Sequence, residues 1–279
     1  MGVVTRQILN ALNDPEYANA NIDVRRVVAK DVLISYVLSF IYNRKKYASL
    51  VFYGGTCAKV VYGLDRFSED IDLDNSMGVG VASFGDELAQ YCKNKMQIEG
   101  ADVYEQSGEG GIRRFVLRVP IMNEIGLSPR MSEKLHVKVE MSNMTKHATV
   151  QKTPLVRHGQ AMVIQHFDLP SLMAGKMVAC LERNWRKGEV AGTDIKGRDF
   201  YDLIWYMNKG VRPNPEVLKH GGEQSYTLDS TWKLLEKKVL KINKNELKFD
   251  LKSFVPNGVY LDNWLDNFQD YFSRLRKSA

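Results

Sequence analysis

The stretch that decides the fold is residues 53–73, YGGTCAKVVYGLDRFSEDIDL. Its last seven residues, 67–73, alternate apolar with polar or acidic side chains, which is the two-residue period of a half-buried strand. Asp70 and Asp72 are therefore expected on one face of that strand, while the apolar residues beside them turn into the core. Because parallel carboxylates repel each other, a hard cation such as Mg²⁺ is expected between them. For an isolated pair, a solvated edge strand is the alternative.

Two glycines precede the acidic strand. Residues 49–53 predict a short apolar strand, Gly54 and Gly55 end it, and Thr56 begins a short helix that stops at Gly63. Glycine lets a phosphate approach the main chain, and a helix N-terminus presents unpaired N–H groups to an anion. A Gly-Gly turn alone is common in tight turns. Followed by a carboxylate pair, however, it favours a site for a metal-bound phosphate compound.

Strands are expected mainly before residue 150 and helices after it. The pattern predicts helices at 23–46 and 85–96, a hairpin at 101–120 with its turn at 107–111, and a strand at 135–141. It then predicts helices at 170–185, 199–208, 234–240 and 260–277, with a flexible connection at 188–197. Residues 149–164 show no decisive pattern. The prediction is a bilobal α/β (α+β) protein, with a mixed-sheet domain at residues 1–150 and a mainly helical domain at 151–279.

The glycine turn and acidic strand resemble the first motif of the AbiEii-type nucleotidyltransferase toxins, in the DNA polymerase β-like nucleotidyltransferase superfamily. The match runs in register without a gap, and Ala58 stands where many relatives have leucine. The matching residues are Gly54, Gly55, Thr56, Gly63, Arg66, Ser68, Glu69, Asp70, Ile71, Asp72 and Leu73. The resemblance implies a polymerase β-like domain, and a toxin that a cognate antitoxin restrains.

The superfamily also uses a third carboxylate on a later strand. Glu140 in KLHVKVEMS is the candidate, although the wider superfamily usually has aspartate there. By strand alternation Glu140 shares a face with His136 and Lys138, which are expected to be solvent-side neighbours or phosphate contacts. An exposed alternating strand is the alternative interpretation.

Residues 172–183 and 196–203 resemble the family's later motifs. The resemblance selects Lys176, Arg183, Arg198, Asp199 and Asp202. Lys176 could neutralise the β- and γ-phosphates as a point charge. Asp199 and Asp202 would share one helix face near its N-terminus, where negative charge is favoured. Helix capping with an ion pair between Arg183 and one of these aspartates is the alternative.

Together these features predict an Mg²⁺-dependent nucleotidyltransferase that transfers a nucleoside monophosphate from an NTP and releases pyrophosphate. Asp70, Asp72 and Glu140 would hold two Mg²⁺ ions, and Asp199 would orient Lys176 or assist the acceptor hydroxyl. The expected nucleotide contacts are Gly54, Gly55, Thr56, Arg66, Ser68 and Lys176. The expected acceptor is RNA, with the tRNA 3′ end as leading candidate. Transfer to a small molecule or a protein, and an inactive nucleotide-binding module, are the alternatives.

Composition sets the remaining expectations. The 279 residues carry a formal charge of +6 and a pI near 9.0, which modestly favours an anionic partner. Seven lysines between Lys233 and Lys252 indicate either a solvated helix face or a phosphate-contacting surface. No apolar run is long enough to span a membrane, and three scattered cysteines predict a cytoplasmic setting. The five histidines show no zinc-motif spacing.

Overall fold

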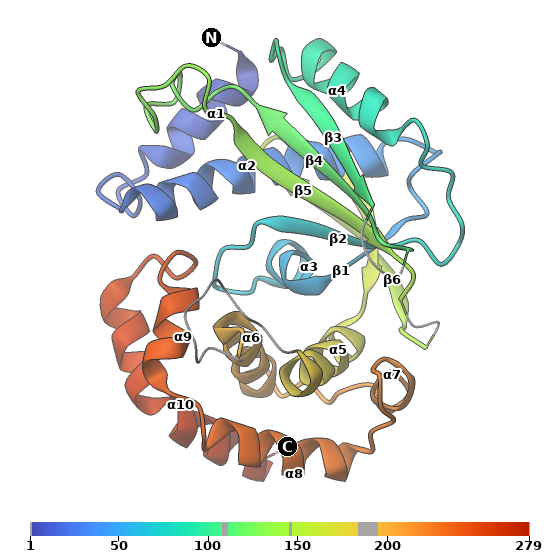
Figure 1. Ribbon diagram of the computed structural model, residues 1–279, viewed down its shortest axis with the longest axis vertical. Coiled ribbons are helices and arrows are strands. Elements are labelled where there is room, and N and C mark those ends of the chain that lie inside the picture. The colour runs from blue at the N-terminus through green and yellow to red at the C-terminus, as the bar shows by residue number, and fades with distance from the viewer. Residues whose placement is uncertain (1, 108–110, 145–146, 184–194, 279) are drawn as a thin grey trace. The chain divides into compact units, whose positions relative to one another are not determined.

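The structure is a computed structural model that describes residues 2–107, 111–144, 147–183 and 195–278 (Figure 1). The chain divides into two compact units. The sheet unit comprises residues 1–61, 67–144 and 150–166, and the helical unit comprises 62–66, 145–149 and 167–279. The turn expected at 107–111 and the connection expected at 188–197 lie largely outside the described residues.

A seven-stranded mixed sheet forms the centre of the sheet unit, in the order β3-β4-β5-β2-β1-β7-β6. The strands are β1 (Val51–Tyr53), β2 (Asp70–Asp74), β3 (Asp102–Ser107), β4 (Arg113–Val119), β5 (Leu135–Ser142), β6 (Val150–Arg157) and β7 (Gln160–Phe167). β2 runs parallel to β5 and β1 parallel to β7, whereas β1–β2, β3–β4 and β4–β5 are antiparallel. The predicted mixed α/β class is confirmed.

Helices α2 (Ile22–Tyr42) and α4 (Phe84–Asn94) pack on the sheet, and α1 (Val3–Leu12) packs on α2. α2 packs against β5 and α1, and α4 packs against β3 and β4. Phe84 of α4 packs against Phe115 of β4 with ring centroids 4.8 Å apart and an interplanar angle of 47°, and Phe115 pairs in register with Val139 of β5. Because side chains alternate along β5, the helix-covered face holds the apolar residues and Glu140 lies on the opposite face.

The stretch without a decisive pattern, residues 149–164, belongs mostly to the hairpin of β6 and β7. His158 and Gly159 form its two-residue turn with φ of +45° and +72°, the left-handed backbone that such tight turns require. Pro154 lies within β6, which is tolerated because β6 is an edge strand of the sheet. This hairpin accounts for the difference between the boundary expected at residue 150 and the compact units.

The helical unit holds six helices within its described part: α5 (Leu169–Glu182), α6 (Gly197–Asn208), α7 (Pro215–His220), α8 (Leu228–Val239), α9 (Lys244–Leu251) and α10 (Gly258–Ser278). Asp168 caps α5 by accepting a hydrogen bond from Ser171 N at 2.9 Å. α5 packs against α6, α7 and α8, while α6 packs against α9 and α10. Among the described helices, none has the length and apolarity of a membrane span.

Candidate active site

The turn between β1 and helix α3 (Gly54–Tyr62) brings the main chain against an acidic side chain. Gly54 has φ of +79°, and a Cβ on this residue would lie 2.3 Å from Asp72 Oδ2. Any side chain at residue 54 would therefore displace the Asp72 carboxylate. The glycine expected to open a phosphate-binding turn thus also makes room for the second aspartate of the acidic strand. Gly55 follows it as the second residue of α3.

The next residue of the turn, Thr56, is 1% exposed. Its hydroxyl is hydrogen-bonded to Ser68 Oγ at 2.7 Å and to the main-chain oxygen of Asp70. Ser68 is 7% exposed. In this arrangement the two hydroxyls join the start of α3 to the start of β2. Their direct contact with a triphosphate stays a prediction.

The three predicted metal ligands lie on two neighbouring parallel strands of the sheet unit. Asp72 of β2 pairs in register with Glu140 of β5, and Asp70 pairs with Lys138. Because residues that pair across a sheet point to the same face, Asp70, Asp72 and Glu140 share the face opposite the helix-covered one. The structure therefore brings the three carboxylates onto one small area of the sheet. Lys138 is exposed on that face, as is His136.

Two residues that the sequence did not single out extend the row of Asp72 and Glu140. Arg114 of β4 pairs in register with Glu140, and its Nε donates to Glu140 Oε1 at 2.5 Å. On the other side, Tyr53 of β1 pairs with Asp72. The alternation of residues 113–119 placed Arg114 on a strand face, but only the strand pairing shows which acidic residue it meets.

The pKa of Tyr53 reflects the negative charge on this face of the sheet. Its pKa is raised above the ordinary value of 10.0, by burial and by the charges of Asp72, Glu140 and Asp74. Asp74 has a structural role, because its Oδ1 accepts hydrogen bonds from the Ser76 hydroxyl and from Met144 N, both at 2.6 Å. Carboxylate oxygens are the ligands that hard divalent cations prefer, and the negative potential around these residues attracts such cations. The residues present therefore fit a Mg²⁺ site.

The helical unit holds the other predicted residues in a buried ionic cluster. Arg66 and Asp202 form a bidentate pair, with Nε–Oδ1 and Nη2–Oδ2 distances both of 2.6 Å. Arg66 is 3% exposed and Asp202 is 0% exposed. The guanidinium of Arg66 is thus engaged inside this unit, and its predicted contact with a nucleotide stays a prediction.

Lys176 of α5 lies between the two aspartates of α6. Its Nζ is 2.8 Å from Asp199 Oδ1 and 2.9 Å from Asp202 Oδ2, and its side chain is 13% exposed. Arg183 Nη1 approaches Asp199 Oδ2 at 2.9 Å. Burial alone would raise the pKa of Asp199, but Lys176, Arg183 and Lys196 outweigh it and lower the pKa to about 2. Asp199 is therefore ionised and holds Lys176 in a fixed position.

Two basic residues at the start of α6, Arg198 and Lys196, lie beside this cluster, and of these only Arg198 forms an ion pair within the described part of the chain. Arg198 Nε lies 3.3 Å from Asp250 Oδ2 of α9, and its guanidinium stacks on Phe254 with 4.0 Å to the ring centroid, so Arg198 anchors the start of α6. Lys196, at the N-cap of α6, was not predicted. Its pKa is lowered from 10.5 to about 8 by burial and by nearby cations, of which Arg198 contributes most.

A further group of possible metal ligands lies elsewhere in the helical unit. Atoms of His147, Glu216 and His220 lie within 4.8 Å of one another, and all three residues are exposed. The two imidazoles are stacked, with centroids 4.2 Å apart and an interplanar angle of 20°. No motif spacing could indicate this group, because chain folding brings His147 to the end of α7. Parallel rings direct their nitrogen lone pairs along parallel planes, so the observed ring positions do not converge on one ion.

Comparisons with known proteins agree with this architecture. A family model described as nucleotidyl transferase AbiEii toxin, type IV TA system, matches residues 39–274. The crystal structure of JHP933 from Helicobacter pylori is 18% identical, with a TM-score of 0.52, over 90% of this chain and 92% of that chain. A second H. pylori structure, reported as that of a candidate nucleotidyltransferase, is 20% identical, with a TM-score of 0.50 over 88% and 95% of the two chains. Among curated proteins, none matches.

Proposed function

Because the chain belongs to the AbiEii family of nucleotidyltransferase toxins, we propose that it transfers a nucleoside monophosphate from an NTP to an RNA acceptor and releases pyrophosphate. In this proposal Asp70, Asp72 and Glu140 would hold Mg²⁺. When bound there, the ion would supply Lewis-acid stabilisation of the phosphate charge and favour loss of the proton from the attacking hydroxyl.

The observation that carries the proposal is the in-register pairing of Asp72 with Glu140, together with the close approach of Gly54 to Asp72. A carboxylate row that served only solubility would impose no such requirement on the neighbouring main chain. The requirement is explained if the position of the Asp72 carboxylate matters. Positioning and charge neutralisation are the main contributions that a protein makes to phosphoryl transfer.

The helical unit contributes a cation in this proposal. Lys176 offsets the charge of the triphosphate, and Asp199 positions its ammonium group, as their 2.8 Å contact supports. Asp202 pairs with both Arg66 and Lys176, and so links the two cations. The Lys176 ammonium could then contact the nucleotide while it stays hydrogen-bonded to Asp199.

The tRNA 3′ end is the acceptor that we propose, and a cognate antitoxin is the partner that family membership implies. A positive net charge supports a polyanionic acceptor over a neutral small molecule. We place the activity in the cytoplasm, where the three cysteines, all free and buried, would stay reduced.

The test incubates the protein with each labelled NTP, Mg²⁺ and total RNA, and follows label into RNA, protein or small molecules. Asp72→Asn should abolish transfer, because it removes the charge while keeping the shape of the side chain. Glu69→Gln is the matched control, since Glu69 lies in the same motif but its Oε1 is paired with Lys30 at 2.6 Å. Label that enters protein or a small molecule would replace the RNA acceptor. Full activity of Asp72→Asn would overturn the metal assignment.

A further inference from the structure

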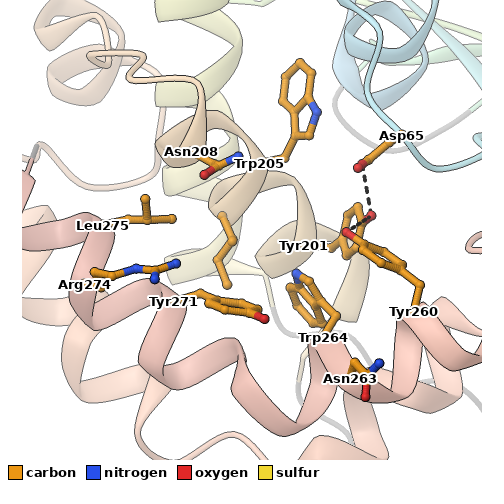
Figure 2. Close-up of a pocket in the computed structure, with 11 residues that line it drawn as sticks. Asp65, Tyr201, Trp205, Asn208, Tyr260, Asn263, Trp264, Tyr271, Arg274 and Leu275 are labelled. Carbon is orange, nitrogen blue, oxygen red and sulfur yellow. Dashed lines mark hydrogen bonds between the residues drawn. The ribbon is translucent and has the colours of Figure 1, made fainter.

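A cavity of about 280 Å³ lies between α6 and α10 of the helical unit, and no residue of the ionic cluster around Lys176 lines it (Figure 2). Its volume is close to the lower end of the range for small-molecule sites, about 300–1,000 Å³. Aromatic side chains form much of its wall. The aromatic and cationic lining residues are Tyr201, Trp205, Tyr260, Trp264, Tyr271 and Arg274.

The aromatic rings divide into a buried floor and an accessible rim. Tyr201 is 2% exposed and Trp264 is 6% exposed, and their ring centroids lie 5.0 Å apart. Tyr260 is 42% exposed, and Trp205 and Tyr271 are half-buried. The floor therefore packs as part of the hydrophobic core. At the rim, Lys209 and Arg274 lie over one face of Trp205 and Tyr271, at 4.8 and 5.6 Å from the ring centroids, so the opposite faces are the ones that a ligand can stack on. A flat ring system is the ligand shape that such faces accommodate best.

Polar groups around the rim suit a base with donors and acceptors on its edge. Asp65 accepts from the Tyr201 hydroxyl at 3.0 Å, and the Tyr201 and Tyr260 hydroxyls are 3.2 Å apart (Figure 2). The amides of Asn208 and Asn263 also line the cavity, and each offers both donors and an acceptor. Within the described part of the chain, neither amide side chain forms a hydrogen bond to another residue.

Cations flank the same rim. Arg274 lines the cavity, and Lys209 lies over the Trp205 ring with its Nζ 4.8 Å from the centroid. The carboxylate of Asp65 is the one acidic group among the described lining residues. Aromatic faces beside Arg and Lys are the combination that single-stranded nucleic acids require, because bases stack on the rings and phosphates meet the cations.

We propose that this cavity binds one unstacked base of a single-stranded RNA, an inference that rests on the RNA acceptor of the proposed function. Stacking on the rim fixes the base, the two asparagine amides contact its edge, and Arg274 with Lys209 contacts the adjoining phosphates. A duplex keeps its bases stacked inside the helix, so it does not present one to the cavity. The cavity therefore selects unpaired RNA, such as a free end or a loop.

The experiment measures binding of a fluorescein-labelled RNA hexamer to the full chain by anisotropy, in the absence of NTP. The double variant Trp205→Ala, Tyr271→Ala should weaken binding at least tenfold, since loss of base stacking weakens binding by roughly 5- to 150-fold. Tyr104→Ala is the matched control, because Tyr104 is an aromatic residue of the sheet unit that is 50% exposed. Arg274→Gln provides a second variant that keeps every aromatic ring of the cavity, and it should flatten the salt dependence of binding.

Three outcomes would overturn the inference. They are equal hexamer affinity of the double variant and the wild type, equal affinity of the wild type for the hexamer and its duplex, and free AMP or UMP binding as tightly as the hexamer. The Asp72→Asn variant separates this inference from the proposed function, because it should bind the hexamer normally but transfer nothing. Absence of transfer by the wild type, with the stacking dependence intact, would refute only the proposed function.

Discussion

Replacing Gly54 with alanine provides a direct test of whether the position of Asp72 controls the activity. The new Cβ would lie 2.3 Å from Asp72 Oδ2, whereas ordinary contacts begin near 3.4 Å. The carboxylate must therefore move by about 1 Å, a misplacement that can cost on the order of 100-fold in rate. The left-handed backbone at φ +79° adds a separate cost of about 1–2 kcal/mol in stability.

Gly63→Ala is the matched control for this variant. Gly63 has φ of +76°, nearly that of Gly54, but a Cβ there would have no neighbour within 4 Å. Both variants should thus lose a similar amount of stability from backbone strain, while only Gly54→Ala should displace a predicted metal ligand.

The assay compares kcat for NMP transfer with urea unfolding for wild type and both variants. We expect Gly54→Ala to lose about 100-fold in kcat and Gly63→Ala to stay within a few-fold of wild type. Wild-type kcat in Gly54→Ala would refute the reasoning. So would an equal loss in Gly63→Ala, because strain alone would then explain the effect.

Three other predictions concern the helical unit. Asp202→Asn should destabilise the protein by about 3–5 kcal/mol in urea unfolding, because it removes the charged partner of the buried bidentate ion pair with Arg66. A decrease below about 1 kcal/mol would contradict this. Lys196 has a folded pKa of about 8 against 10.5, so its charge costs stability below pH 8 and that cost disappears as the pH rises toward 10.5. Lys196→Met should therefore be more stable than wild type at pH 7, by no more than about 3 kcal/mol, and this gain should disappear by pH 10.5. A variant that is less stable than wild type at pH 7 would exclude this account. Charge reversal of three exposed lysines between Lys233 and Lys252 should make the affinity for RNA depend less steeply on salt concentration. The slope of log K against log salt concentration should fall by about 0.7–0.9 for each phosphate that the protein no longer neutralises, and an unchanged slope would exclude these lysines from the RNA-binding surface. These lysines are Lys233, Lys237 and Lys241.

Local patterns predicted the elements whose burial alternates most clearly. β5 alternates buried and more exposed residues along its length, as residues 135–141 indicated. The helix expected at 23–46 is present as α2, but from Asp31 to Tyr42 it is buried on all sides, so its burial does not follow a single apolar face. The pattern failed for β6, where an edge position leaves most side chains exposed and tolerates Pro154. It also predicted one helix within the basic run, where the structure has two, α8 and α9, with Asn243 capping α9.

The candidate site was predictable where its residues are close in sequence or carry a family motif. Asp70 and Asp72 follow from strand alternation alone. The ion pair of Arg114 with Glu140 depends on the register between β4 and β5, which no local pattern encodes. Arg66 was selected as a nucleotide contact, but its partner Asp202 lies 136 residues later in the chain. Only the folded chain shows that this arginine is enclosed in an ion pair.

The charges of the ionic cluster explain why Lys196 is a poor proton binder. Lys176 and Arg183 pair with Asp199, and Arg198 lies beside them at the start of α6, so three cations surround the Lys196 ammonium. Their repulsion disfavours a further positive charge at Lys196, and burial limits the solvation that would otherwise stabilise it. If a polyphosphate binds beside Lys176, as we propose, its negative charge should raise the pKa of Lys196 toward the ordinary value. The same cations that cost the free protein stability would then favour an anionic ligand over a neutral one.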